Sequence, residues 1–243
     1  MTNMGHMVIE MEKWTREDFD RYFEKVTGAI SPDDPKERKR LTIVRAGTEL
    51  FIQQGYRKTS VEEIAARAGV AKGTVYLYFQ NKAQILLHAI IEEKKRYVHH
   101  IEPVLRPETP PRERLRTWLG LMFALPSQMP LVSKLLSGDR EILTALDEVM
   151  AEVPHDMRGL SLDFIGGLVD GAASPHGWNR VEVEDRARVL MALSYFSGLI
   201  AEERVRGGLS VERFATILSD MIVDGIGPSR AGRGGSDPAG GQP

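Results

Sequence analysis

The chain has 243 residues, enough for two modest domains, and its apolar (42%) and charged (27%) fractions are ordinary for a globular protein. It has no cysteine, which excludes disulfides, thiolate zinc sites and a cysteine nucleophile, and fits a reducing cytoplasm. The net charge of −2 conceals thirteen basic and six acidic side chains in residues 36–98, between two acidic segments. Such a basic block predicts a nucleic-acid-facing unit.

Residues 1–35 are expected to form an extension with one amphipathic helix over 15–28. Thr15 is suited to the N-cap with Asp18 in the first turn, and Trp14 and Phe19 are placed to form a hydrophobic staple. The apolar stripe that follows has helical spacing and comprises Phe19, Tyr22, Phe23 and Val26. A DNA-contacting arm is the alternative, but four basic and eight acidic side chains would be repelled by phosphate. We therefore expect this helix to dock on the protein, followed by a linker over 31–35.

The next predicted helix runs over residues 36–54, with Ile43, Ala46 and Leu50 on its core side. Its first turns, residues 36–40, are basic. This run predicts a weak electrostatic attraction to a DNA backbone, and the alternative is a solvated helix end.

Residues 59–82 carry a helix-turn-helix pattern. Ser60 and Glu63 have the spacing of a capping box, and Gly69 is suited to the left-handed residue that closes the first short helix. A second helix is predicted from Ala71 to Phe79, with Val75 and Phe79 facing inward. Two helices joined by a short glycine-containing turn are typical of DNA-binding units.

The polar side of the second helix matches the chemistry of a DNA groove. We expect it to read bases through Lys72, Gly73, Thr74 and Tyr76. We expect phosphate contacts from Thr59, Ser60, Tyr78 and Lys82. The alternative is a packing unit of three helices that carries polar side chains outside by default. The Glu62 carboxylate would oppose a nearby phosphate, so the first helix is expected to make few base contacts.

The rest of the chain has helical periodicity, no period-2 runs and no internal repeat. Helices are predicted over 82–101 with a stop at Pro103, from about 112 to Pro126, from Pro130 to Val153 with a bend at Gly138, around 157–171, over 183–206 and over 210–226. Residues 227–243 are rich in Gly, Ser and Pro and are expected to be disordered. No apolar run approaches the roughly 20 residues that span a bilayer, so no membrane partner is expected.

Large soft side chains within residues 82–226 predict a pocket for a small hydrophobic effector. The candidate lining residues are Trp118, Met122, Phe123, Met150 and Phe164. The alternative is that these side chains are ordinary core.

Metal and catalytic chemistry find no support in the sequence. The six histidines lack the spacing of a zinc site and are interpreted as surface or linker residues, and no nucleophile elbow or phosphate-binding glycine loop occurs. We expect no cofactor, no metal and no enzymatic activity.

From Arg38 to Ile91 the chain resembles the N-terminal domain of TetR-family transcriptional regulators. The residues that carry the resemblance are Ile43, Ala46, Leu50, Phe51, Gly55-Tyr56, Thr59-Ser60-Val61, Ile64-Ala65, Ala68-Gly69-Val70, Lys72-Gly73-Thr74-Val75-Tyr76, Tyr78-Phe79, Lys82 and Leu86. It implies an all-α fold with a DNA-binding domain over 36–81 and a helical effector-binding and dimerisation domain over 82–226. It also implies a dimeric repressor or activator that senses a small molecule, and our leading hypothesis is a homodimeric repressor that binds pseudopalindromic double-stranded DNA.

In such regulators the last two long helices pair with their copies in a second subunit. The dimer residues that this implies are Leu193, Phe196, Ser197, Ile200, Phe214 and Leu218. The alternative function is a helical ligand-binding or enzymatic domain with the helix-turn-helix unit as scaffold. The sequence does not separate a repressor from an activator, and it names neither the operator nor the effector.

Overall fold

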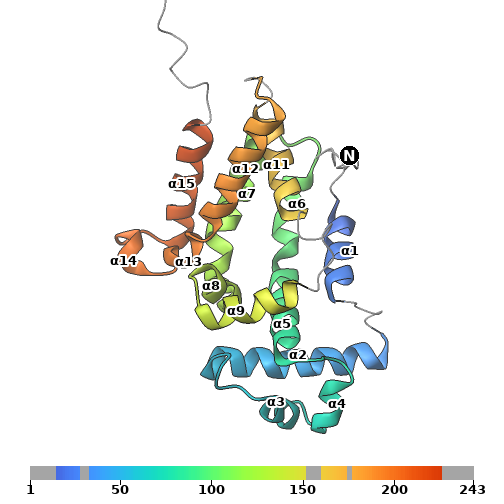
Figure 1. Cartoon of the computed structure of the whole chain (residues 1–243). Helices are drawn as coiled ribbons and strands as arrows, with labels where there is room; N and C mark the ends of the chain where they lie inside the picture. Colours follow the sequence, from blue (N-terminus) through green and yellow to red (C-terminus); the bar gives the residue numbers. More distant parts are fainter. Residues whose placement is uncertain (1–14, 28–32, 152–159, 174–176, 226–243) are drawn as a thin grey trace, which may run out of the picture.

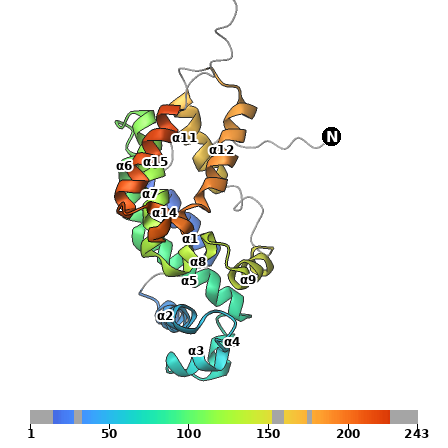
Figure 2. The ribbon, with the colours of Figure 1, turned by 90° about the vertical axis from the view of Figure 1, so that its left-hand side faces the viewer.

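The computed structural model describes residues 15–27, 33–151, 160–173 and 177–225, and within these ranges the chain is helical with no strand (Figure 1). The predicted all-α fold is confirmed. α2 (Pro35–Gln54), α3 (Val61–Arg67) and α4 (Lys72–Tyr76) form a unit at one end, from which α5 (Lys82–Tyr97) rises. The view in Figure 2 places this unit, called the reading domain below, at the tip of an elongated molecule.

The predicted N-terminal helix is present as α1 (Arg16–Thr27). The backbone N–H of Thr15 donates to Asp18 Oδ2 at 2.8 Å, and the N–H of Asp18 donates to Thr15 Oγ1 at 3.3 Å, so the expected cap forms. α1 lies against α5 (Figure 1). Trp14 and the side chains of Tyr22 and Val26 lie outside the described part of the structure.

α2 begins one residue earlier than expected, because the Asp34 carboxylate caps it through the N–H of Lys36 and Pro35 occupies its first turn. Its core face is as predicted, with Ile43, Ala46 and Leu50 all buried.

Two hydrophobic clusters hold the molecule together. The first contains the reading-domain core and continues into α5, α8 (Pro130–Leu136) and α9 (Arg140–Met150). The second joins α7 (Pro111–Ala124), α11 (Leu160–Ala173), α12 (Arg180–Ser194) and α15 (Val211–Gly225). The first cluster therefore crosses the expected domain boundary between residues 81 and 82.

The connection after α5 differs from the expected stop at Pro103. α5 ends at Tyr97, a 3-10 turn η2 (Val98–Ile101) follows, and Pro103 lies in the first turn of α6 (Glu102–Leu105). Proline is tolerated there because the first turn of a helix has no intrahelical acceptor for its missing N–H.

The helices around the second cluster are broken more often than the periodicity suggests. α7 is followed by a 3-10 turn η3 (Leu125–Gln128), and the expected bend at Gly138 is a full break between α8 and α9, with a φ of 82°. The prediction of a single helix over 183–206 is wrong, because this segment is divided into α12, α13 (Ser197–Ile200) and α14 (Glu203–Arg206).

Gly198 gives a tertiary reason for this division. A Cβ atom at Gly198 would lie 2.5 Å from the backbone nitrogen of Ser137, so α13 packs directly against the chain at the end of α8. Gly207 ends α14 with a φ of 59°, as expected, and the Ser210 hydroxyl caps α15 through the N–H of Arg213 at 3.1 Å.

No single helix of the described ranges is both long and apolar enough to cross a membrane, although the consecutive segments Pro111–Gln128 and Pro130–Leu136, bent by 112° at the break between them, meet both criteria together. The expected tail over 227–243 lies outside the described residues.

Candidate nucleic-acid interface

The helix-turn-helix forms through the predicted caps. The N–H of Glu63 donates to Ser60 Oγ at 3.2 Å, and the N–H of Ser60 donates to Glu63 Oε2 at 2.8 Å. Gly69 adopts a φ of 67°, which a glycine accepts without strain. This turn delivers the chain to α4.

α4 is shorter than the predicted helix over 71–79, since it ends at Tyr76. Val75 and Phe79 are nevertheless buried, as expected, because the turn after α4 continues through hydrogen bonds from Tyr78 and Phe79 to the Val75 carbonyl.

The outward side of α4 is open to solvent and is called the reading face, comprising Lys72, Gly73, Tyr76 and Leu77. The Tyr76 side chain is 49% exposed and Leu77 is 83% exposed, while Thr74 and Tyr78 are half-buried at its edges. Leu77 was missed at the sequence level, although its position opposite the inward Val75 and Phe79 could have indicated it. Solvent-exposed leucine beside a tyrosine offers apolar contact to a thymine methyl group.

Lys72 is paired with Glu62 of α3, which lies on the same exposed surface. The hydrogen bond from the ammonium lowers the pKa of Glu62 and raises the pKa of Lys72. The ammonium also lies 5.9 Å from the centroid of the Tyr76 ring. Without DNA, the charge of Lys72 is therefore compensated within the protein.

Two residues expected to contact phosphate are hydrogen-bonded within the protein: Thr59 is buried, which corrects its prediction, and Lys82 is half-buried, so its phosphate contact stays a prediction. Lys82 Nζ donates to the carbonyl oxygens of Tyr56 at 2.8 Å and Thr59 at 2.7 Å, and lies 4.2 Å from the centroid of the Tyr56 ring. Burial lowers the pKa of Lys82. The Thr59 side chain is buried, and its hydroxyl donates to the Gly55 carbonyl at 2.8 Å. Both residues stabilise the turn before α3, Thr59 from a buried position and Lys82 from one that is partly open to solvent.

A buried polar cluster lies behind α4. Arg40 donates to Glu37 Oε2 at 2.8 Å and also contacts His88 Nδ1, and the His88 ring meets Phe79 edge-on at 5.1 Å. Burial and the Arg40 charge lower the pKa of His88 to about 3. The interpretation of His88 as a surface histidine is therefore wrong, and so is a fully solvated start of α2. Neutral His88 accepts from Arg40, which fixes α2 against α5.

The reading domain also touches α8 and α9. The N–H of Arg57 donates to Glu141 Oε2 at 3.1 Å, beside an open cleft of about 410 Å³ that Tyr56, Lys82, Arg140 and Glu148 help to line. The buried Glu93 carboxylate of α5 accepts from the N–H groups of Leu131 at 3.0 Å and Val132 at 3.1 Å, and burial raises its pKa. These contacts tie α5 to the start of α8.

The predicted effector residues are only partly brought together. Phe123 and Phe164 are buried in the second cluster, with Trp118 and Met122 packed against it. Met150 lies on α9 and packs against the first cluster, so it is separate from the other four.

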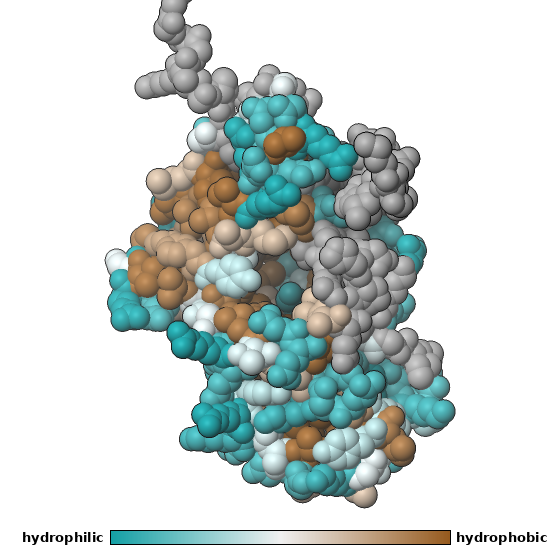
Figure 3. Space-filling view, viewed as in Figure 1, coloured by the Kyte–Doolittle hydropathy of each residue, from teal (hydrophilic) through white to brown (hydrophobic). Residues whose placement is uncertain are grey.

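The residues predicted for dimerisation are divided in the same way. Ser197 and Ile200 are buried within the subunit, at 1% and 0% exposure, so they cannot face a partner. Leu193, Phe196, Phe214 and Leu218 are half-buried against the second cluster. None of the six predicted dimer residues is among the apolar side chains most open to solvent on α12 to α15, which are Val181, Val189, Tyr195, Leu199 and Met221. Figure 3 shows apolar surface gathered over this part of the molecule.

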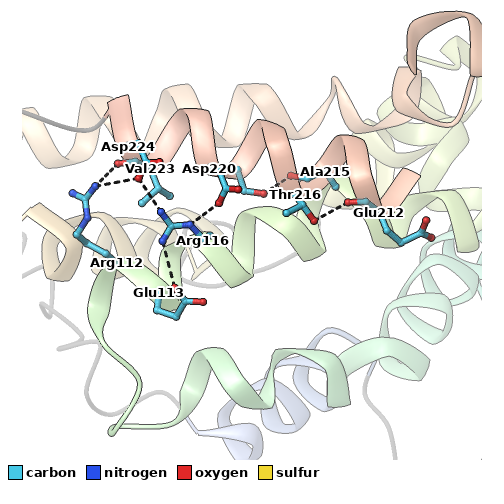
Figure 4. Close-up of polar contacts among 10 residues, drawn as sticks. Arg112, Glu113, Arg116, Glu212, Ala215, Thr216, Asp220, Val223 and Asp224 are labelled. Atoms are coloured by element: carbon cyan, nitrogen blue, oxygen red, sulfur yellow. Dashed lines mark hydrogen bonds and ion pairs between the residues drawn. The ribbon is translucent and has the colours of Figure 1, made fainter. Parts of the chain in front are cut away.

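α15 is held in place by charged residues of α7 (Figure 4). Arg116 donates to Asp220 at 2.7 Å and Asp224 at 2.8 Å, and Arg112 donates to the Val223 carbonyl at 2.6 Å. Among the described residues, no group of three or more His, Asp or Glu side chains is arranged to hold a metal ion.

Comparisons with known proteins agree with this geometry. Residues 43–89 match the family model described as bacterial regulatory proteins, tetR family. The chain is 26% identical over 199 residues to the fatty acid metabolism regulator protein of Bacillus subtilis, which covers 79% of this chain and 97% of that protein.

Solved structures extend the likeness to the whole fold. FadR from Bacillus subtilis in complex with stearoyl-CoA superposes with a TM-score of 0.56 at 19% identity, covering 77% of this chain and 99% of that one. AibR in complex with isovaleryl coenzyme A and operator DNA gives a TM-score of 0.55 at 20% identity, covering 75% and 97%. The family match, the relative of nearly full length and the exposed helix-turn-helix identify this chain as a member of the TetR family and a DNA-binding transcriptional regulator.

Proposed function

We propose that this chain is a homodimeric repressor of lipid-related genes that a fatty acyl thioester of coenzyme A releases from its operator. The observation that carries the proposal is the similarity to a fatty acid metabolism regulator over 97% of that protein's length. Two structural neighbours hold acyl-coenzyme A molecules, one with a long acyl chain and one with a short branched chain.

The reading face supplies the DNA contacts in this proposal. Lys72, Tyr76 and Leu77 are exposed on a short helix with Gly73 between them, and a Cβ at Gly73 would meet nothing within 4 Å. An exposed helix of this kind fits the major groove, where lysine donates to guanine and an apolar side chain meets thymine. Thr74, Tyr78 and Ser60, at the margin of the reading face, would contact phosphates.

The effector would place its acyl chain among apolar side chains of the second cluster. Trp118, Met122, Phe123 and Phe164 come from α7 and α11 and supply aromatic and thioether surface suited to a flexible hydrocarbon. Met150 is left out of this assignment.

Dimerisation would cover the exposed apolar side chains of α12 to α15. Val189, Tyr195 and Met221 are 60%, 52% and 68% exposed. They lie on helices over which apolar surface gathers (Figure 3), and a contiguous apolar patch of this kind marks an interaction site. Two copies paired by a two-fold axis would present two reading faces to the half-sites of a pseudopalindrome. Such a regulator acts in the cytoplasm, where the chromosome lies, and we assign it no catalytic activity.

The test is a fluorescence-anisotropy titration of the full chain against DNA fragments from beside its own gene, at two salt concentrations. A fragment that binds tightly, with a two-fold symmetric footprint, is then titrated with acyl-coenzyme A thioesters of increasing chain length. Release by at least one thioester, with free coenzyme A inactive, supports the proposal. Tight operator binding that no thioester weakens would refute the effector and leave the DNA-binding assignment intact.

A further inference from the structure

A pair of opposite charges joins the two helices of the helix-turn-helix at their starts. Lys72 Nζ, in the first turn of α4, donates to Glu62 Oε1, in the first turn of α3. The two side chains are 51% and 59% exposed. In both ribbon views α3 and α4 form the outer edge of the reading domain, beyond α2 (Figures 1 and 2). The pair therefore meets DNA together with the reading face.

The pair keeps hydrogen-bonding groups for DNA. The ammonium has three N–H donors and the carboxylate has two accepting oxygens, and the bond between them engages one donor and Oε1. The contact lowers the pKa of Glu62, so its carboxylate is ionised at neutral pH and only accepts. The Tyr76 ring, 5.9 Å from the ammonium, flanks the pair on α4. The protein thus offers a donor and an acceptor side by side.

A guanine–cytosine base pair offers the complementary pattern in the major groove. Guanine presents two neighbouring acceptors, N7 and O6, and cytosine presents its N4 amino group as a donor. Since O6 and N4 are hydrogen-bonded to each other within the base pair, they lie about 3 Å apart, which is the spacing of a bonded ammonium and carboxylate. In an adenine–thymine pair the N6 donor lies between the acceptors N7 and O4, so two neighbouring acceptors for the ammonium are absent.

We propose that Glu62 is a specificity-determining residue that accepts from the cytosine N4 group of the same base pair whose guanine accepts from Lys72. The two side chains then read one base pair as a unit, and α3 gains a base contact. At other sequences the carboxylate meets acceptors, and this repulsion lowers the affinity for wrong sites. The inference rests on DNA recognition by the reading face and is independent of the effector.

The test begins with an operator that the wild-type full chain selects from a random duplex library. Each base pair is then replaced in both half-sites, and affinities are measured by fluorescence anisotropy. For the wild type, replacing one guanine–cytosine pair should weaken binding by about 5- to 150-fold, the range for a base contact. In Glu62→Ala this penalty should shrink by about fivefold, the effect of one hydrogen bond, while the penalties at other positions stay unchanged.

Two further variants separate base reading from simple charge. Glu62→Gln keeps an accepting oxygen of the same shape and loses the charge, so it should bind all DNA more tightly and retain most of the preference for the guanine–cytosine pair. Glu49→Ala is the matched control. Glu49 of α2 is 61% exposed and pairs with Arg67 at 2.9 Å, so its loss removes an equal charge away from α4 and should keep every wild-type penalty.

A purely electrostatic role for Glu62 would give a different pattern. In that case Glu62→Ala binds every sequence more tightly by the same factor and keeps the wild-type penalties, which would overturn the inference. An operator in which no guanine–cytosine pair responds to Glu62→Ala would also overturn it and leave the proposed function intact. Failure of the wild type to select any operator would instead overturn DNA reading by α4, on which the proposed function also depends. Circular dichroism checks folding, and Glu62→Met replaces Glu62→Ala if the latter is unfolded.

Discussion

Lys82→Met separates a structural role of this lysine from a role in phosphate binding. The substitution keeps the length of the side chain and removes the ammonium that donates to the Tyr56 and Thr59 carbonyls. A hydrogen bond to a charged group contributes about 1.5–3 kcal/mol, and a cation above an aromatic ring adds about 0.5–2 kcal/mol. Because Lys82 is partly open to solvent, which weakens these contacts, we expect a net loss of about 2–4 kcal/mol.

The assays are thermal and urea-induced unfolding, together with operator binding over a range of salt concentrations. In a chain of this size each kcal/mol lowers the melting temperature by about 2–4 °C, so the expected decrease is about 4–16 °C. We expect the slope of log affinity against log salt to stay at the wild-type value, because the ammonium is already bound to the Tyr56 and Thr59 carbonyls.

The exposed Lys58 of the same turn provides the matched control, and Lys58→Met should leave stability unchanged. The reasoning is refuted if Lys82→Met unfolds like the wild type and reduces the salt slope by about 0.9, the value for one lost phosphate contact.

Three further predictions concern other parts of the molecule. Glu62→Ala removes the partner of the Lys72 ammonium, so binding to DNA without an operator should strengthen. The slope of log affinity against log salt, measured by anisotropy, should steepen by about 0.9. An unchanged slope would mean that Lys72 lies away from phosphate. His88 has a folded pKa of about 3 against an ordinary 6.5, so the unfolded chain binds more protons between these values. The free energy of unfolding therefore falls as the pH falls from 6.5 toward 3, by up to about 1.4 kcal/mol per pH unit, as measured by urea unfolding. His88→Asn should reduce this pH dependence. An equal pH dependence in both proteins would contradict the burial of a neutral ring. Met221→Glu places a charge on the exposed apolar surface of α15 and should give a folded monomer by light scattering and circular dichroism, whereas a stable dimer would move the interface elsewhere.

Local signals in the sequence predicted the reading domain well. The capping box at Ser60 and Glu63 and the left-handed Gly69 depend on residues close in the chain, so they could be recognised without the fold. The same holds for the cap of α1 and for the core face of α2.

The errors arise from contacts between distant segments. Gly198 breaks the predicted helix over 183–206 because it packs on Ser137, about 60 residues earlier in the chain. Lys82 is bound by the Tyr56 and Thr59 carbonyls of the turn before α3, and His88 is buried against Arg40 of another helix. Periodicity shows which side of a helix is apolar, but it cannot show whether a polar side chain will find a buried partner. Ser197 and Ile200 were misplaced for the same reason, since α13 packs inside its own subunit.

The order of the two clusters along the chain limits how this regulator can be recombined. The first cluster draws on residues up to Val98 and again on Met129 to Val149, while the second draws on Val104 to Phe123 and again on Phe164 to Val223. A chimera with a single junction after α5 would therefore combine mismatched halves of the first cluster. The same holds for a junction in the loop after Phe79, where the reading domain ends in sequence. Exchange of DNA specificity between related regulators would succeed more readily by grafting the few side chains of the reading face than by transplanting the domain.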